Sequence, residues 1–227
     1  MPLVLPATLD RLHERLFVAG YASVQARSEA AGMRDVRRAV VAPARGRVLE
    51  IGAGTGLNLA HYGPGVTSLV LVEPAPAMRD VLADAVARGP GREGWSVPGV
   101  AAQASVVDGH GERLPAADGS VDVVVGTFVL CSVEDPEAVL REIARVLHPG
   151  GRYLGIEHVR GSTPGLARAQ GAVAPAWRFL ARGCRCDQDA AALIARSSLL
   201  LEESETFRGP RQPWPVRPGL RFAARRP

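Results

Sequence analysis

Three glycines and two acids lie where the chain could hold a charged small molecule. The run Gly52-Ala53-Gly54-Thr55-Gly56 follows a short apolar segment at 47–51, and glycines at this spacing let the backbone turn tightly and approach a ligand. Glu50 precedes the first glycine by two positions, where a carboxylate favours an ammonium or sulfonium group over a pyrophosphate. Glu73 ends the next apolar segment, where it can accept hydrogen bonds from the hydroxyls of a ribose. The pattern predicts a nucleoside ligand with a cationic arm, such as S-adenosylmethionine.

A dinucleotide-binding loop is the main alternative for this glycine run. The G-x-G-x-x-G pattern of such loops needs its last glycine at position 57, where this chain has Leu57. Glu50 also disfavours a diphosphate. A dinucleotide-dependent oxidoreductase therefore remains as an alternative, together with a protein that binds S-adenosylmethionine without catalysing a reaction.

Candidate residues for catalysis and metal binding lie later in the chain. Glu157-His158 ends a predicted strand, so we expect His158 to position an acceptor or to take its proton. Cys184 and Cys186 lack the second ligand pair that structural zinc sites use, and no histidine or cysteine follows them. We therefore expect no metal site.

Strands alternate with helices along the chain, which predicts an α/β fold with a parallel sheet and helices on both of its faces. Ligands of such sheets bind at the carboxyl ends of the strands. The predicted strands lie at 47–51, 67–72, 100–107, 121–125, 152–156, 199–207 and 219–224. We expect helices at 9–42, from the glycine loop to His61, and at 76–88, 135–148, 165–182 (broken by Gly and Pro) and 187–198, with a loop over 89–99.

Length and composition set the domain organisation. The chain has 227 residues, of which 47% are apolar, enough for one α/β domain over 45–227. Residues 1–44 are expected to form helices that, with Trp177 and Phe179, cover an acceptor pocket. The absence of an apolar stretch of 18 residues predicts no membrane anchor, and three cysteines in a chain of this length favour the reducing cytoplasm.

The positive charge is confined to the end of the chain. The net charge is +4, but six arginines and no acids lie from Arg208 onward, so residues 1–207 carry a net charge of −2. A nucleic-acid interface would spread basic residues over a face of the fold. We therefore interpret the basic end as a solvated tail and expect a small-molecule partner rather than a nucleic acid. The sequence leaves the oligomeric state open.

Three blocks of sequence resemble a known family. Glu50-Ile51-Gly52-Ala53-Gly54-Thr55-Gly56 resembles motif I of the class I (Rossmann-like) S-adenosylmethionine-dependent methyltransferases. The segment 112–124 is similar to a segment of their quinone-methylating branch, and 145–151 resembles the helix end before their fifth strand. The resemblance implies a seven-stranded, mostly parallel sheet in the order 3-2-1-4-5-7-6, with strand seven antiparallel.

A narrower resemblance concerns the acceptor. The segments 117–125, 129–133, 157–159, 175–177 and 183–184 resemble the mammalian membrane-associated alkyl thiol methyltransferases and their bacterial relatives. This resemblance implies a small, largely apolar acceptor, which could be a thiol, a quinone-like ring or a phenol. The hydrophobic N-terminal anchor of the mammalian proteins has no counterpart here.

The resemblance also implies which residues contact the cofactor. They are Glu50, Gly52, Ala53, Gly54, Gly56, Asn58, Glu73, Pro74, Gly109, His110, Gly111, Glu112 and Thr127. Where many members have G-D-A-E after strand three, this chain has Gly109-His110-Gly111-Glu112, so adenine recognition is expected to rest on backbone groups of 110–112. The segment 127–131 should flank the transferred methyl group. It lacks the N-P-P-Y sequence of enzymes that methylate nucleobase amino groups, which argues against a DNA or RNA acceptor.

Overall fold

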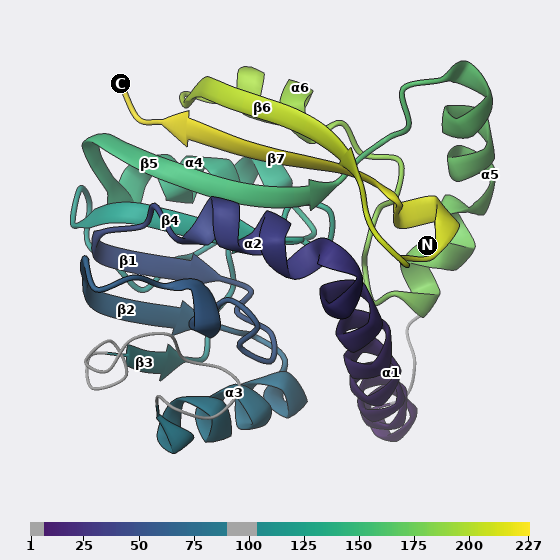
Figure 1. Cartoon of the computed structure of the whole chain (residues 1–227), viewed down its shortest axis with the longest axis horizontal. Helices are drawn as coiled ribbons and strands as arrows, with labels where there is room; N and C mark the ends of the chain where they lie inside the picture. Colours follow the sequence, from purple (N-terminus) through teal and green to yellow (C-terminus); the bar gives the residue numbers. More distant parts are fainter. Residues whose placement is uncertain (1–6, 90–103) are drawn as a thin grey trace.

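A seven-stranded sheet forms the centre of the molecule (Figure 1). The computed structural model describes residues 7–89 and 104–227, except for the side chains of 7–16 and 19. The strands are β1 Gly46–Ile51, β2 Val66–Val72, β3 Ala104–Val107, β4 Val121–Thr127, β5 Leu147–His158, β6 Leu200–Arg208 and β7 Pro218–Arg225. Their order is β3-β2-β1-β4-β5-β7-β6, and β7 runs antiparallel to both of its neighbours. The predicted order and the antiparallel strand are both confirmed.

Helices cover both faces of the sheet, as predicted. They are α1 Ala7–Ser28, α2 Arg34–Val41, α3 Pro76–Arg88, α4 Pro136–Val146, α5 Pro164–Leu180 and α6 Ala190–Ala195. Helices α2 and α3 contribute to the core on one face, and α4 and α6 contribute to the core on the other. Figure 1 shows α1 and α5 beyond the carboxyl ends of the parallel strands. These two helices therefore border the edge where ligands of such sheets bind.

The two cores follow from the alternation of side chains along each strand. On β1, Val48 faces α2 and α3, while Leu49 packs on the side of α4. On β4, Val123 and Val125 share the first core, and Val124 lies in the second. All five side chains are at most 8% exposed, so both faces of the central strands are dry. A continuous run of apolar, mostly β-branched residues is what such a strand requires.

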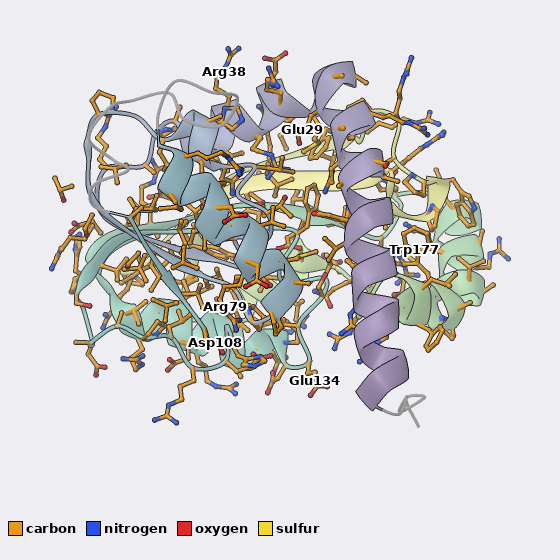
Figure 2. The ribbon with its side chains drawn as sticks, turned by 90° about the horizontal axis from the view of Figure 1, so that it is seen from below. Glu29, Arg38, Arg79, Asp108, Glu134 and Trp177 are labelled. Carbon is orange, nitrogen blue, oxygen red and sulfur yellow. The ribbon has the colours of Figure 1, made fainter. Side chains whose placement is uncertain are left out.

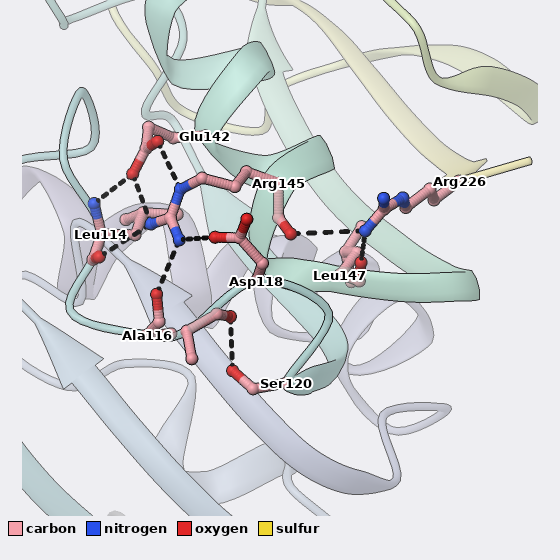
Figure 3. A network of polar contacts seen from close by, with 9 residues as sticks. Leu114, Ala116, Asp118, Ser120, Glu142, Arg145, Leu147 and Arg226 are labelled. Atoms are coloured by element: carbon pink, nitrogen blue, oxygen red, sulfur yellow. Dashed lines mark hydrogen bonds and ion pairs between the residues drawn. The ribbon is translucent and has the colours of Figure 1, made fainter.

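One arginine fastens the long connection between β3 and β4 to α4 (Figure 3). Arg145 donates hydrogen bonds to the carbonyl oxygens of Leu114 and Ala116 and pairs with Asp118 at 2.7 Å. Its partner on α4, Glu142, accepts in turn from the Leu114 N–H at 2.8 Å. Residues 112–124, which resemble the quinone-methylating branch, are therefore held by a polar network beside the sheet.

Three predicted elements differ in the structure. The helix expected from the glycine loop to His61 is only a 3₁₀ turn at Leu59–His61, because Gly56 has a φ of 87° and the residues before Leu59 form tight turns instead. The region 165–182 is one helix, α5, which starts at the Thr163 cap with Pro164 in its first turn and continues through Pro175. Strand β5 begins at Leu147 and carries a register shift opposite β4, so it includes the predicted Pro-Gly-Gly turn.

Three of the six C-terminal arginines, Arg208, Arg221 and Arg225, lie in strands of the sheet, so the interpretation of this segment as a solvated tail was wrong. Arg221 and Arg225 on β7 pair with Glu205 and Glu202 on β6. Alternation of arginine with Leu220, Phe222 and Ala224 explains this placement, because a strand sends alternate side chains to opposite faces. The predicted loop at 89–99 and the first part of the predicted third strand lie largely outside the described residues. Within the described residues, no helix is both long and apolar enough to cross a membrane.

Candidate active site

The glycine loop connects β1 to the 3₁₀ turn at the carboxyl edge of the sheet. Gly52, Gly54 and Gly56 all have positive φ angles, of 61°, 58° and 87°, which residues with a side chain adopt only with strain. A Cβ atom at Gly54 would have no neighbour nearer than 3.9 Å, whereas one at Gly52 would lie 2.9 Å from Val129. The space beside Gly54 is thus open to a ligand, and Gly52 permits close packing of the loop on the end of β4.

Glu73 faces this loop from the end of β2. The carboxylate is 4% exposed, and its Oε2 accepts a hydrogen bond from the Gly54 N–H at 2.8 Å. Its Oε1 accepts from the Ala75 N–H at 2.9 Å. These two bonds fix the Glu73 carboxylate beside the glycine loop, where a ligand held by the loop would lie next to it.

A small hollow lies between the glycine loop and the N-terminal helices. Its lining is Tyr21, Arg37, Gly52, Ala53, Gly54, Thr55, Leu57, Asn58 and Thr127. Arg37 of α2 donates hydrogen bonds to Asn58 Oδ1 at 2.8 Å and to Thr127 Oγ1 at 3.1 Å, and it pairs with Glu29 at 3.0 Å. Glu29 compensates the charge of this buried guanidinium, but Arg37 still brings N–H donors to the wall of the hollow, where they can contribute to holding a carboxylate.

Glu50 lies beneath the hollow and supports it. The side chain is 1% exposed, accepts from Asn58 Nδ2 at 2.8 Å, and accepts from the Tyr62 hydroxyl at 2.5 Å. Burial raises the pKa of Glu50 to about 7, although the hydrogen bonds from Tyr62 and Asn58 and the charge of Arg37 act in the opposite direction. Glu50 therefore positions Asn58. We expected it to face a cationic group directly, but the structure shows Asn58 between Glu50 and the hollow.

The segment after β3 lies beside Glu73. Backbone pairing continues past the strand end, since the Glu73 N–H donates to the Val107 carbonyl at 3.1 Å. Asp108 pairs with Arg79 of α3, as Figure 2 shows, and His110 is exposed. A Cβ atom on Gly111 would lie 3.1–3.2 Å from Val139 and Ile51. The stretch 109–112 thus borders the same edge of the sheet as the glycine loop.

His158 ends β5 and lies next to two cysteines. Its ring stacks on Phe128 with a centroid distance of 4.2 Å and an interplanar angle of 22°. Its Nδ1 is 3.6 Å from Cys131 Sγ and 3.5 Å from Cys184 Sγ. Its Nε2 is buried and has no hydrogen-bond partner among the described residues. Phe128 adopts a φ of 63°, an uncommon conformation at the end of β4 that is typical of functional sites.

Glu157 holds the loop that carries Cys131. This carboxylate is fully buried and accepts hydrogen bonds from the N–H groups of Val129, Leu130 and Cys131 at 2.7–3.0 Å. A carboxylate that binds three successive N–H groups fixes their loop rigidly against the end of β5. The backbone after β4 therefore has a single orientation toward His158.

Of the residues predicted from sequence, five line the hollow: Gly52, Ala53, Gly54, Asn58 and Thr127. The side chains of Glu50 and Glu73 accept hydrogen bonds from two of these residues, Asn58 and Gly54. Gly56 packs on Leu59 instead, and Pro74 is exposed at the end of β2. Trp177 projects from α5 (Figure 2) and packs near Cys131, whereas Phe179 is 39% exposed. Sequence reasoning did not single out Arg37 or Tyr21 as site residues, and it included Cys131 only as part of the segment 127–131 expected to flank the methyl group.

The fold and the position of this site define a Rossmann-like methyltransferase architecture. A structure described as an S-adenosylmethionine-dependent methyltransferase from Thermotoga maritima superposes with a TM-score of 0.64 at 20% identity, covering 96% of this chain and 99% of that one. The [4+2]-cyclase SpnF also superposes, with a TM-score of 0.64 at 16% identity, covering 87% and 81% of the two chains. Because a cyclase shares it, the fold alone does not specify the reaction.

Sequence comparison agrees with this architecture. Residues 49–155 match the family described as "Methyltransferase domain". The human thiol S-methyltransferase TMT1A is 36% identical over 153 residues, which are 66% of this chain and 59% of that protein. The ubiquinone/menaquinone biosynthesis C-methyltransferase UbiE of Rubrivivax gelatinosus is 35% identical over 132 residues, which are 58% of this chain and 45% of that protein. The chain therefore spans 45–59% of the length of these two relatives, and the resemblance drawn from its motifs is confirmed.

Proposed function

We propose that this protein transfers the methyl group of S-adenosylmethionine to a small, largely apolar acceptor, with a thiol as the first candidate. One observation carries the proposal: the open, positive-φ glycine loop lies between the buried Glu73 carboxylate and the buried Arg37 guanidinium. On one side of the loop, Glu73 is a hydrogen-bond acceptor for ribose hydroxyls. On the other side, Arg37 is a cationic donor for a carboxylate. The two relatives, a thiol S-methyltransferase and a ubiquinone/menaquinone biosynthesis C-methyltransferase, support this class of acceptor.

The residues of the chain have separate parts in binding the cofactor. Glu73 would accept the ribose hydroxyls, Gly52 and Gly54 would admit the methionine part against bare backbone, and Arg37 would hold its carboxylate. Backbone groups of 110–112 remain the proposed contacts for adenine. When bound, the sulfonium supplies an activated methyl group with a good leaving group, so the protein chiefly has to align the acceptor and exclude water.

His158 is the proposed acceptor-side residue. Phe128 fixes the plane of its ring, and the buried Nε2 is available to an acceptor. The surroundings are apolar, because Cys131, Cys184, Cys186 and Val216 form a buried cluster against which Trp177 packs. Apolar surroundings of this kind suit a lipophilic thiol better than a highly charged acceptor.

Residues 1–44 are proposed to act as a lid. Tyr21 of α1 and Arg37 of α2 line the hollow, so the N-terminal helices lie directly over the glycine loop. A lid that closes over the cofactor would exclude water from the transfer. We also propose a cytoplasmic location, which the three free cysteines favour.

Thermal unfolding tests the cofactor assignment first. A ligand at 100 times its dissociation constant adds about 2.7 kcal/mol, or about 5–10 °C in Tm for a chain of this size. We expect this shift with S-adenosylmethionine and with its demethylated product, and none with NADH or NADPH. A shift with the nicotinamide cofactors alone would instead support the oxidoreductase alternative.

Two substitutions locate the binding site. Glu73→Ala removes a charged hydrogen-bond acceptor and should weaken S-adenosylmethionine binding by about 1.5–3 kcal/mol. Gly54→Val should abolish binding, because the added side chain would occupy the open space beside the loop. Gly89→Val is its matched control: Gly89 has a φ of 66° and open surroundings but caps α3, so this variant shares the backbone strain while binding should persist. Calorimetry showing unchanged affinity for folded Gly54→Val would refute the assignment.

An acceptor panel then tests the reaction. The purified chain is incubated with S-adenosylmethionine and a short alkyl thiol, a hydroquinone or a phenol, and methylated products are measured by mass spectrometry. We expect the methyl thioether of the thiol. Methylation of the hydroquinone alone would favour a quinone-type acceptor, and cofactor binding without any product would support the non-catalytic alternative.

A further inference from the structure

Two cysteines and a histidine converge on the acceptor side of the proposed site. Cys131 Sγ and Cys184 Sγ are 3.9 Å apart, and His158 Nδ1 is 3.6 Å from the first and 3.5 Å from the second. Both cysteines are buried, and neither forms a disulfide. The three residues come from the loop after β4, the end of β5 and the loop after α5, so tertiary packing alone brings them together.

The triangle of ligand atoms has the dimensions of one face of a tetrahedral zinc site. With Zn–S bonds of about 2.3 Å and Zn–N bonds of about 2.0–2.1 Å, tetrahedral angles place two sulfur atoms about 3.8 Å apart and a sulfur and a nitrogen about 3.5 Å apart. The three distances given above agree with these values to about 0.1 Å. Hydrogen bonds among two thiols and an imidazole would have similar distances. The chemistry of the donor atoms therefore has to distinguish a metal site from a hydrogen-bonded cluster. Two sulfurs and an imidazole form a soft set that selects thiophilic metals.

The three ligands are held before any ion binds. The Glu157 carboxylate fixes the N–H groups of the Cys131 loop, and Phe128 stacks on the His158 ring. The Arg185 N–H donates to the Cys131 carbonyl at 2.6 Å, which ties the two cysteine loops together. Gly183 packs so closely that a Cβ atom there would lie 2.7 Å from the Ser132 carbonyl oxygen. Such preorganisation lowers the entropic cost of assembling a metal site.

The geometry points to a Zn²⁺ site formed by Cys131, His158 and Cys184, with its fourth position open to a thiol. Three protein ligands and one free position are the arrangement of catalytic rather than structural zinc. Sequence spacing argued against a metal because Cys184 and Cys186 lack a second ligand pair, but the fold pairs Cys184 with Cys131 instead. On binding, both cysteine thiols release their protons to solvent and become thiolate ligands.

The open position would activate an acceptor thiol, an extension that rests on the proposed function. When a thiol occupies it, the S–H bond breaks, a metal–sulfur bond forms, and the proton leaves to solvent. The resulting thiolate attacks the sulfonium methyl group: a new S–CH₃ bond forms, the old one breaks, and the demethylated cofactor keeps the electron pair. The neutral thioether product is a weaker ligand and dissociates. With Nδ1 on the metal, His158 acts through the ion rather than as a proton acceptor.

Cobalt spectroscopy tests the site independently of activity. The full chain, reduced and freed of metal, is titrated with Co²⁺ and then with Zn²⁺ under exclusion of oxygen. We expect one equivalent of Co²⁺ to produce the sulfur-to-cobalt absorption and strong visible bands of a tetrahedral site, and Zn²⁺ to displace it. A short alkyl thiol should then shift the sulfur-to-cobalt band. Failure of the reduced chain to bind either ion would overturn the site, and an unchanged band on thiol addition would overturn the open position.

Serine substitutions assign the ligands. Cys131→Ser and Cys184→Ser should each weaken metal binding at least tenfold. Cys186→Ser is the matched control, because Cys186 is equally buried and two residues from Cys184, but its thiol donates to the Gln170 carbonyl. Equal losses in all three variants would refute the assignment. The Tm shift of the metal-free chain with S-adenosylmethionine separates the two proposals. If the cofactor still raises Tm but no metal binds, only the metal site is refuted. If metal binds but the cofactor does not raise Tm, only the proposed cofactor is refuted.

Discussion

Replacing Glu50 with glutamine should change how the stability of the protein depends on pH. The carboxyl group is buried, and its pKa is raised to about 7 from an ordinary value of 4.5. An acid whose pKa is raised by folding contributes stability that is complete below the unfolded pKa and is lost as the pH rises through the folded pKa. Glutamine keeps the size of the side chain and remains neutral, so Glu50→Gln removes this loss.

The size of the effect follows from the shift. A difference of about 2.5 pKa units corresponds to about 3.4 kcal/mol in total, at about 1.36 kcal/mol per unit. About 2.5 kcal/mol of this should be lost between about pH 5 and pH 8. For a chain of this size, that is about 5–10 °C in Tm.

Urea unfolding of both proteins in a pH series measures the effect. We expect the free energy of unfolding of the wild type, minus that of Glu50→Gln, to fall steadily between about pH 5 and pH 8. Subtraction cancels the titration of groups that the two proteins share. A constant difference, or one that rises with pH, would show that Glu50 is ionised in the folded protein and that our account of its burial is incorrect.

Glu142→Gln provides a control of opposite sign. The ion pair with Arg145 lowers the pKa of Glu142, so its contribution is present above the unfolded pKa and is lost as the pH falls below about 4.5. The wild type should therefore lose stability relative to Glu142→Gln only in acid. The two variants together test the direction of each shift as well as its presence.

Two further pairs of variants test packing and the buried ion pair. Gly155→Ala should lower the free energy of unfolding by about 1–3 kcal/mol, because the added Cβ would lie 2.2 Å from the Phe222 ring. Gly171→Ala, on the exposed side of α5, should instead raise it by about 0.5–1 kcal/mol. Chemical denaturation measures both changes, and equal effects would contradict the packing described for Gly155. Arg37→Gln should cost about 3–5 kcal/mol, because it leaves the buried Glu29 carboxylate unpaired. The double variant with Glu29→Gln should regain most of that stability and still bind S-adenosylmethionine at least tenfold more weakly; restored affinity in calorimetry would exclude Arg37 from cofactor binding.

The residues themselves were sufficient for most strands of the sheet and for the glycine loop after β1, whereas the strand order followed from the family resemblance. These predictions used local signals, which the sequence contains without any knowledge of the fold. The signals are strand periodicity, the continuous apolar run 121–125 and the capping residues of α4. Glycines that need positive φ, such as Gly52 and Gly54, are also local requirements. A prediction failed where long-range neighbours decide: the basic C-terminal segment, interpreted as a tail, forms β7 between β5 and β6.

The position of Arg37 in the sequence indicated a buried charge but did not identify its partners. Met33, Val40 and Val41 form a buried stripe at helical spacing, and Arg37 occupies a position within that same stripe. A charged residue on an apolar face predicts a buried partner. The identity of that partner depends on which groups the rest of the fold brings to the stripe, and those are Asn58, Thr127 and Glu29.

Only the tertiary structure decided the arrangement on the acceptor side. Cys131, His158 and Cys184 are separated by 27 and 26 positions, and no short-range pattern relates them. Parallel strands joined by crossovers bring the ends of β4 and β5 to one edge, and the turn of the chain after α5 returns Cys184 to the same place. Distances between such residues depend on how the strands pair and how the helices pack, and these long-range contacts have no periodic trace in the sequence.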